Sequence, residues 1–451
     1  MNYDIKAGFS RVNITSPLGI EISGYYVQRI ADGVLDELEI NTLAVSKDDS
    51  TVLLMSVDTL GLNAAFINSM KELITAATGI PAEAIFIHAT HTHTAGKLPN
   101  RNTITSELET DYMQMVRRAG VNAAVLAIND LKPAKMGYAV SEAKNIAFNR
   151  RYLMKDGSTK TNPGVNNPDI VRSIGLLDER VNVLRFLRED GTSLVLINFG
   201  NHPDTVGGTK LSCDWPGFTR RIFEKAIDNT RCIFFNGAQG DINHVNVFPK
   251  GGDLNDMFID FDDVSRGYGH ARHCGNVVAA AAMQVYDKVC YTDVDCIKAV
   301  IRTVDVPSNK PLPEEMPEAR HIHQMHLDGR DAELPYQGMM LTTMVADAAR
   351  KMRLENGPDS FPLPLGAIRI GNVALFGIPG EPFTGIGLGL KEAEGWDMVL
   401  PCCCTNGYSG YFPMKDSYDE GGYEAKSSPF KSGTAEMLIK EGTALLDDLR
   451  K

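Results

Sequence analysis

The sequence predicts an α/β fold in which a mixed β-sheet core is flanked by helices. Short apolar runs alternate with amphipathic stretches along the chain, as strands and helices do in this fold class. Five of the apolar runs end in polar clusters, at residues 84–93, 194–204, 232–241, 372–383 and 397–411. Because residues just beyond the C-terminal ends of strands line the ligand crevice of α/β sheets, we expect these endings to share one site.

The clearest strand and helix signals lie near the two ends of the chain. Residues 51–59, TVLLMSVDT, predict a buried strand, and residues 64–79, AAFINSMKELITAATG, predict a helix that ends at Gly79. Residues 435–451 predict a final helix. The apolar face of the first helix is expected to carry Phe66, Ile67, Met70, Leu73 and Ile74.

We expect one domain that spans residues 1–451, because the chain has no internal repeat and no low-complexity tract. Residues at about 308–358 are least like strands, since prolines and charges flank helical patterns there. We interpret this segment as a helical insertion on the surface. Its histidines at helical spacing, His323 and His326, are interpreted as part of a solvated face rather than as metal ligands.

Composition favours a small-molecule substrate. The net charge of -12 argues against nucleic acid and anionic membrane as partners. No segment has the apolar core of a signal peptide or the roughly 18 apolar residues of a membrane span. The run of Cys402, Cys403 and Cys404 among eight cysteines fits a reducing compartment, so we expect a cytoplasmic protein. The oligomeric state is unknown at this level.

Three of the ten histidines lie within six residues, after an apolar run. His91 and His93 are two residues apart, so an extended backbone would send both side chains to the same face. Zinc binds imidazoles of this kind, and a carboxylate would complete a site with an open position for water. His88 has the opposite parity and is expected to be packed and hydrogen-bonded. The other strand endings add the candidates His202, Asp241, Glu381 and Tyr411.

The order of short motifs along nearly the whole chain resembles the catalytic domain of the neutral/alkaline (non-lysosomal) ceramidase family. The matching motifs are AGFSRVNIT, SGYYVQ, HATHTHTAG, FNRRY, NHPDT, CDWPGF, GAQGDIN, PGEPFT and NGYSGYFPMKDSYDEGGYEA. Each motif is weak alone, but the ordered set is fairly specific. The resemblance implies the fold of that catalytic domain and a zinc amidohydrolase activity.

The resemblance also implies a set of metal ligands. The first histidine of H-T-H, the histidine of the next strand ending, the glutamate of P-G-E and the second tyrosine of Y-x-x-Y correspond to His91, His202, Glu381 and Tyr411. These four residues are expected to hold one zinc ion. Tyrosine is an unusual ligand because its reference pKa is about 10, so the cation would have to acidify or polarise the phenol.

Three further residues are implied around the substrate carbonyl: His93, Arg150 and Tyr423. Zinc lowers the pKa of bound water to about 7, which provides a nucleophile for an amide or ester carbonyl. His93 could then pass a proton to the leaving nitrogen, while Arg150 and Tyr423 could stabilise the oxyanion.

The chain departs from the family pattern beside the expected site. GDINHVN stands where the family reads G-D-V-S-P-N, so Asn243 replaces a serine and His244 replaces a proline. A covalent serine mechanism at that position is therefore excluded. We also expect no counterpart of the C-terminal immunoglobulin-like domain of the family. These departures favour a small soluble amide over ceramide as the substrate.

Other functions remain open at the level of sequence. Asn243 and His244 would suit a polar, sugar-like substrate, and the same metal site could serve a lactone or ester hydrolase, a lyase or an isomerase. A non-catalytic binding protein that is stabilised by its metal is a further alternative. Manganese, iron or nickel could take the place of zinc in such a ligand set.

Overall fold

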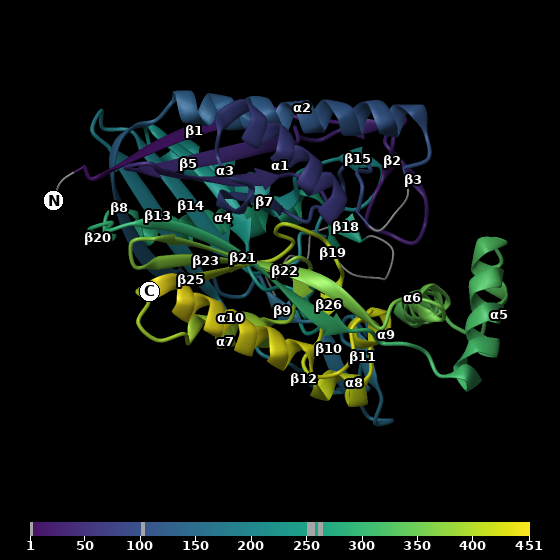
Figure 1. Ribbon diagram of the computed structural model, residues 1–451. Helices are drawn as coiled ribbons and strands as arrows, with labels where there is room; N and C mark the ends of the chain where they lie inside the picture. Colours follow the sequence, from purple (N-terminus) through teal and green to yellow (C-terminus); the bar gives the residue numbers. More distant parts are fainter. Residues whose placement is uncertain (1–2, 101–103, 250–257, 260–264) are drawn as a thin grey trace.

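The computed structural model describes residues 3–100, 104–249, 258–259 and 265–451 (Figure 1). Within these residues the largest sheet has nine strands, in the order β16-β14-β13-β8-β1-β5-β6-β7, with β20 paired to β8. The strands are β1 Ile5–Asn13, β5 Glu39–Lys47, β6 Ser50–Val57, β7 Ile85–Ala89, β8 Lys132–Glu142, β13 Arg180–Arg188, β14 Ser193–Phe199, β16 Thr230–Asn236 and β20 Cys290–Thr292.

The large sheet is mixed, as the sequence predicts. The pairs β6/β7 and β14/β16 are parallel, and the other neighbours are antiparallel. A second, four-stranded sheet has the order β21-β22-β23-β25, with β23 and β25 parallel. Its strands are β21 Ile297–Pro307, β22 Ser360–Ile370, β23 Val373–Gly377 and β25 Met398–Cys402.

Helices flank both sheets (Figure 1). Helix α2 packs against β1 and β5 of the large sheet and α1 packs against α2, while α3 and α4 pack against β13, β14 and β16. Helices α7 and α10 cover the second sheet. The bounds are α1 Ala64–Thr78, α2 Glu107–Asn129, α3 Asp214–Ala226, α4 Tyr268–Tyr286, α7 Thr384–Lys391 and α10 Thr434–Arg450.

The core lies on both faces of β14, which explains its continuous apolar sequence. Leu194 and Leu196 belong to the central cluster shared with the second sheet, whereas Val195 and Ile197 pack with α3 and α4. A strand buried on both faces reads as an unbroken hydrophobic run. Burial of each such side chain stabilises the fold by about 1.5–3 kcal/mol.

Helix α1 confirms the predicted helix but not all of its apolar face. Asn63 caps its first turn by accepting a hydrogen bond from the backbone of Phe66, and Gly79 ends it with a φ of 75°. The prediction that Leu73 is buried is wrong, because Leu73 is 41% exposed. Lys71 is buried instead, at 3% exposure. Long lysine stems can line an apolar surface, which hydrophobic periodicity does not register.

Two helices occupy the segment in which a helical insertion is expected. They are α5 Met316–Leu327 and α6 Gly338–Leu354, and their own small apolar cluster includes Ile322 and Val345. Figure 1 shows them projecting to one side of the two sheets.

The remaining strands of the described residues are short or form small separate sheets. They are β2 Glu21–Ile22, β3 Arg29–Ile30, β4 Gly33–Val34, β9 Phe148–Asn149, β10 Arg151–Met154, β11 Thr159–Thr161, β12 Ile170–Ile174, β15 Lys210–Leu211, β17 Ile242–Asn243, β18 Phe258–Ile259, β19 Ser265–Arg266, β24 Glu381–Pro382 and β26 Tyr411–Phe412. Two short helices follow them, α8 Asp416–Glu420 and α9 Tyr423–Ser427. Among the described helices, none is both long and apolar enough to cross a bilayer.

Hydrogen bonds join the C-terminal ends of strands from both sheets. The side chain of Asn198 in β14 donates to the carbonyl oxygens of Phe235 in β16 and Pro401 in β25, each at 3.0 Å. The backbone of Cys403 donates to Asn236 at 3.0 Å. The strand endings that carry the candidate residues therefore lie at one junction.

Candidate metal centre

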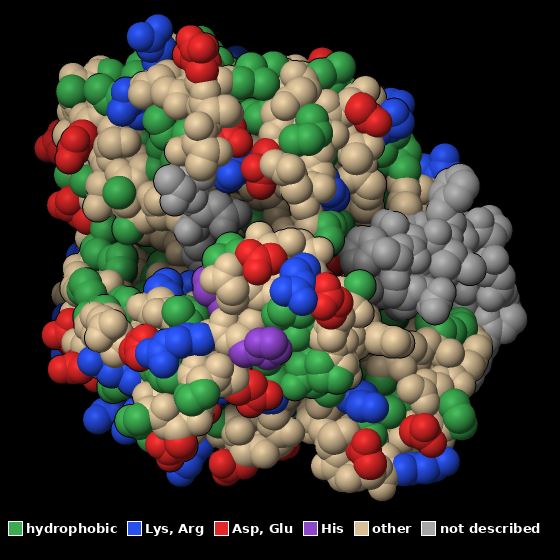
Figure 2. Space-filling view, turned by 90° about the vertical axis from the view of Figure 1, so that its right-hand side faces the viewer, with side chains coloured by type: hydrophobic (Ala, Val, Ile, Leu, Met, Phe, Trp, Pro, Cys, Tyr) green, Lys and Arg blue, Asp and Glu red, His purple; other side chains and the backbone are tan. Residues whose placement is uncertain are grey.

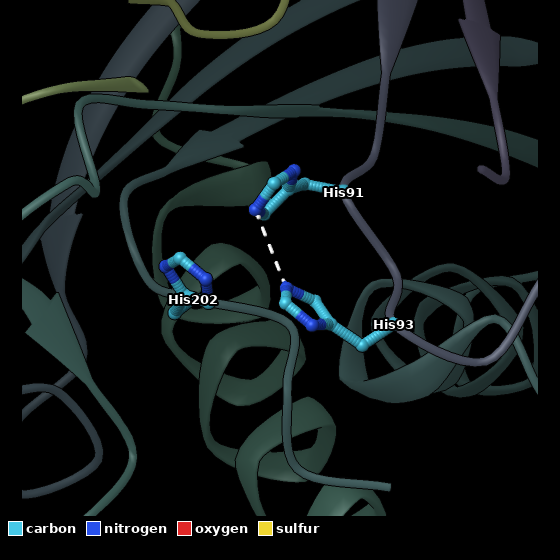
Figure 3. A group of neighbouring side chains, drawn as sticks. All are labelled: His91, His93 and His202. Atoms are coloured by element: carbon cyan, nitrogen blue, oxygen red, sulfur yellow. Dashed lines mark hydrogen bonds between the residues drawn. The ribbon is translucent and has the colours of Figure 1, made fainter. Parts of the chain in front are cut away.

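Three histidines form a buried cluster at this junction (Figure 3). His91 and His93 follow β7, and His202 follows β14. Their candidate ligand nitrogens all lie within 4.8 Å of one another, and the Nε2 atoms of His91 and His93 are 3.4 Å apart. Such spacing matches imidazoles that could share one metal ion.

The backbone at His91 is not extended. The expectation that an extended backbone sends the side chains of His91 and His93 to the same face is therefore wrong. His91 has a φ of 72°, a left-handed conformation that strains a residue with a Cβ by about 1–3 kcal/mol. Its N–H donates to the carbonyl of Thr59 at 2.9 Å, and its Nδ1 lies 2.6 Å from the carbonyl oxygen of Leu60. These contacts fix the turn and make Nδ1 the donor, which leaves the Nε2 lone pair directed at the cluster.

The third imidazole is positioned by the loop after β14. The indole of Trp215 donates to the carbonyl of His202 at 3.3 Å. The carboxylate of Asp214 accepts hydrogen bonds from the backbone of Thr205 and Val206, at 2.9 and 2.8 Å. Burial lowers the pKa of His202 well below its usual value, so the imidazole is neutral and able to bind a cation.

Glu381 brings a carboxylate to the imidazoles. Its Oε2 lies 3.3 Å from Nε2 of His91 and 3.9 Å from Nε2 of His202, and this buried oxygen makes no hydrogen bond. Its Oε1 accepts a 2.7 Å hydrogen bond from the hydroxyl of Tyr408. Burial acts to raise the pKa of Glu381, but the charge and hydrogen bond of a protonated His91, together with the hydroxyl of Tyr408, outweigh burial and lower the pKa to about 2. A metal cation bound to Nε2 of His91 would take the place of that proton.

The donor set fits a metal cation. A buried ionised carboxylate is costly unless a cation or hydrogen bonds compensate it, and Oε2 of Glu381 lacks hydrogen bonds. Imidazole nitrogens and a carboxylate oxygen are preferred ligands of zinc and of related transition metals. A buried group of His91, His93 and His202 could therefore hold a metal ion, with Glu381 beside it.

Tyr411 lies next to this cluster through strand pairing. It is the direct partner of Glu381 in the parallel pair β24/β26. Burial, with the nearby charge of Glu381, raises the pKa of the Tyr411 phenol well above its usual value. The phenol of Tyr411 is therefore neutral in the absence of a nearby cation. A bound cation would have to acidify or polarise the phenol, as expected for a tyrosine ligand.

Arg150 and Tyr423 both lie beside the ring of Tyr411. The guanidinium carbon of Arg150 lies 5.3 Å from the centre of the Tyr411 ring, and the rings of Tyr411 and Tyr423 are 5.6 Å apart. Arg150 also forms a buried ion pair with Glu424 at 2.7 Å and donates to the carbonyl of Gly240 at 2.7 Å. These bonds fix the guanidinium beside the site.

Some candidates lie outside the cluster. Asp241 accepts hydrogen bonds from the backbone and hydroxyl of Thr384, at 2.7 and 2.8 Å, so it holds the start of α7. Asn243 donates to the side chain of Asn162 at 3.0 Å. The ring of His244 stacks edge-on against His270, at 4.9 Å between centroids.

His88 is packed and hydrogen-bonded as expected, although parity does not distinguish it, because every residue of β7 is buried. It is fully buried, and its ring stacks on Phe235 with centroids 4.6 Å apart. Its Nε2 accepts a hydrogen bond from the backbone of Asn236, and its Nδ1 donates to the carbonyl of Cys403 at 2.8 Å. Both nitrogens are therefore used in joining β7 to β16 and to the loop after β25.

Sequence reasoning missed four residues of the site. Asp204 lies 3.7 Å from Nδ1 of His93 and accepts a 2.5 Å hydrogen bond from Tyr25. Tyr408 supports Glu381, and Glu424 pairs with Arg150. Tyr408 could have been found as the first tyrosine of Y-x-x-Y, and Asp204 as part of the polar ending after β14.

No protein-family model and no curated protein matches this chain. Solved structures are similar in fold. Neutral ceramidase from Pseudomonas aeruginosa has a TM-score of 0.74 at 18% sequence identity, over 99% of this chain and 75% of that one. A structure described as ceramidase complexed with C2 has a TM-score of 0.72 at 16% identity, over 99% and 76% of the two chains. The chain therefore has the neutral ceramidase fold, which the ordered motifs predict.

Proposed function

We propose that this protein is a zinc-dependent amidohydrolase that cleaves the carbon–nitrogen bond of a small soluble amide. The observation that carries the proposal is the buried Oε2 of Glu381, which makes no hydrogen bond and faces His91 and His202. A carboxylate in that position calls for a cation. The similarity in fold to neutral ceramidase supports the reaction class.

His91, His202, Glu381 and Tyr411 are the proposed ligands. Zinc held there would supply a Lewis acid for the substrate carbonyl and would lower the pKa of water to about 7. The contact between His91 and the Leu60 carbonyl, together with the hydrogen bond from Tyr408 to Glu381, orients two of these ligands.

His93 is proposed to transfer the proton to the leaving nitrogen. Burial lowers its pKa to about 3, so its imidazole is neutral at pH 7 and can accept a proton. The carboxylate of Asp204, 3.7 Å from Nδ1, would stabilise the imidazolium that results. The hydrogen bond from Tyr25 keeps this carboxylate in place.

Arg150 and Tyr423 are proposed to stabilise the oxyanion. Arg150 is held by Glu424 and by the carbonyl of Gly240, so its charge is fixed before substrate binds. Burial and the interaction with Tyr26 raise the pKa of Tyr423 well above its usual value, so its phenol stays protonated at neutral pH and would turn its hydrogen bond from Tyr26 to the oxyanion when substrate binds. Preorganised donors of this kind are worth about 10²–10³ in rate for each donor.

The substrate proposal is a small polar amide rather than ceramide, and the proposed location is the cytoplasm. Both rest on the sequence, including its net charge of -12 and the replacement of the family serine by Asn243. We propose neither nucleic acid nor membrane as a partner. Asn243 bonds to Asn162, so it gives no added support to a sugar-directed lyase or isomerase.

The test compares a bacterial cytosolic extract after incubation with zinc-loaded protein and with the His91→Ala variant, by untargeted mass spectrometry. The proposal predicts a metabolite that disappears only with the wild type and yields an amine and an acid whose masses sum to its mass plus one water. Alcohol products would indicate an ester hydrolase. Products formed without water would indicate a lyase or isomerase, and no change in any metabolite would favour a binding protein.

A further inference from the structure

Among the described residues, aromatic rings lie on the more exposed side of the histidine cluster. His93 is 8% exposed, and Tyr25, whose ring lies 5.7 Å from that of His93, is half-buried. Tyr26 follows in the loop between β2 and β3 and is 42% exposed. His91, His202 and Glu381 are buried below them. A substrate that reaches the cluster from this side therefore passes these rings.

A continuous series of contacts connects Tyr411 to helix α5. The rings of Tyr411 and Tyr423 lie 5.6 Å apart. Tyr423 and Tyr26 share a hydrogen bond, which adds to the effect of burial on the pKa of Tyr423. The ring of Tyr26 lies edge-on to that of His326 in α5, with centroids 6.5 Å apart. The exposed end of this series is thus made by Tyr26 and His326, which come from segments 300 residues apart.

The helices behind His326 are fixed to the site rather than standing free of it. Arg350 of α6 donates to the carbonyl of Lys426 in α9 at 2.7 Å, and α9 begins at Tyr423. The amino group of Lys426 also contacts the sulfur of Met344 in α6 at 3.7 Å. The position of α5 and α6 is therefore coupled to the residue proposed to stabilise the oxyanion.

The chemistry of this rim is polar and aromatic. Nδ1 of His326 lies 2.9 Å from a carboxylate oxygen of Asp331, which orients the imidazole. Figure 2 views the molecule from the side on which α5 and α6 project, and histidine and charged side chains gather on that face among scattered hydrophobic ones. Aromatic faces pack on flat rings, while the hydroxyl and imidazole edges form hydrogen bonds.

We propose that Tyr26 and His326 form a specificity rim that binds a ring-bearing part of the substrate, outside the bond that is cleaved. This inference rests on the proposed amidohydrolase function and narrows it to amides that carry a ring with hydrogen-bonding substituents. Aryl amines present a flat ring, and amino sugars present the C–H face of a puckered ring with polar edges. An unbranched alkyl chain offers neither a ring face nor polar edges to these two residues.

The test uses three acetamides that would release the same product, acetate. They are 4-nitroacetanilide, N-acetylglucosamine and the ring-free N-butylacetamide, each given to the zinc-loaded full-length protein. Binding is followed by saturation-transfer difference NMR, which needs no turnover, and acetate release gives kcat/KM. The variants are Tyr26→Ala, Tyr26→Phe and His326→Ala, with His321→Ala as the matched control, because His321 is an exposed histidine of the same helix.

We expect at least one ring probe to bind about tenfold more tightly than N-butylacetamide, and Tyr26→Ala and His326→Ala to weaken that binding by about 3- to 10-fold through loss of ring contacts. Tyr26→Phe should keep most of the binding, and His321→Ala should change nothing. The probe that responds identifies aryl or sugar as the class. Two results would refute the proposed specificity rim. One is equal binding of all three probes, and the other is a preference for ring probes that is unchanged in Tyr26→Ala and His326→Ala. Tyr26-dependent binding without acetate release would instead overturn the hydrolase function alone.

Discussion

We expect the hydroxyl of Tyr408 to strengthen metal binding at the site, although Tyr408 is not one of the proposed metal ligands. Tyr408→Phe removes the 2.7 Å hydrogen bond to Oε1 of Glu381 and keeps the ring. A hydrogen bond to a charged group contributes about 1.5–3 kcal/mol, which corresponds to a factor of about 10–150 in a dissociation constant. Loss of outer contacts to metal ligands typically costs about 10–100-fold in affinity, which agrees with this range.

The assay is competition for zinc between the protein and a chromophoric chelator at pH 7.5. Glu381 has a pKa lowered to about 2, so it stays ionised at that pH in our account and the change acts on its position rather than on its charge. Tyr418→Phe is the matched control, since it also removes a 2.7 Å hydroxyl hydrogen bond, to the carbonyl of Phe430. We expect weaker zinc binding only in Tyr408→Phe. Equal zinc affinity in wild type and Tyr408→Phe would refute the reasoning.

Three predictions concern stability. Arg220→Ala leaves Asp58 buried without the two hydrogen bonds of 3.0 and 2.7 Å that Arg220 donates, so urea unfolding should show a loss of about 3–5 kcal/mol in the free energy of unfolding. A small loss would mean that water reaches Asp58. Burial lowers the pKa of Lys71 from 10.5 to about 7, so the unfolded chain binds more protons between these values and stability should rise with pH across that window. Lys71→Met should abolish this rise and stabilise the protein at pH 7, by an amount on the order of 4 kcal/mol, and an unchanged pH profile would refute the assignment. Gly275→Ala places a Cβ 2.4 Å from Cβ of Phe218, so the midpoint of thermal unfolding should fall by several degrees. An unchanged midpoint would show that α3 and α4 can move apart without loss of stability.

The fold was predictable wherever local pattern and tertiary packing agree. The apolar runs that end near His91, His202 and Glu381 are strands β7, β14 and β23, and His88 is packed as expected. Burial of β14 on both faces produces the apolar run that makes it recognisable. The ordered motifs added the neutral ceramidase fold, which the solved structures confirm.

What the sequence could not provide depends on contacts between distant residues. The left-handed backbone of His91 is stabilised by Thr59 and Leu60, about 30 residues earlier, so spacing alone suggested an extended segment. Tyr408 and Glu424 acquire their roles only through packing against Glu381 and Arg150. The Nε2 atoms of His93 and His91 also lie only 3.4 Å apart. The spacing of these histidines in the sequence therefore does not show which one binds the metal and which one carries the proton.

The most direct measurement is the zinc content of purified full-length protein, determined by inductively coupled plasma mass spectrometry after dialysis against a weak chelator. Wild type, Glu381→Ala and the surface control Glu394→Ala are measured side by side. Our account predicts about one zinc ion per chain in wild type and in Glu394→Ala, and little zinc in Glu381→Ala, because the buried carboxylate and the imidazoles bind the metal together. Equal zinc content in all three proteins would contradict the assignment of Glu381, and with it the metal centre on which the proposed reaction depends.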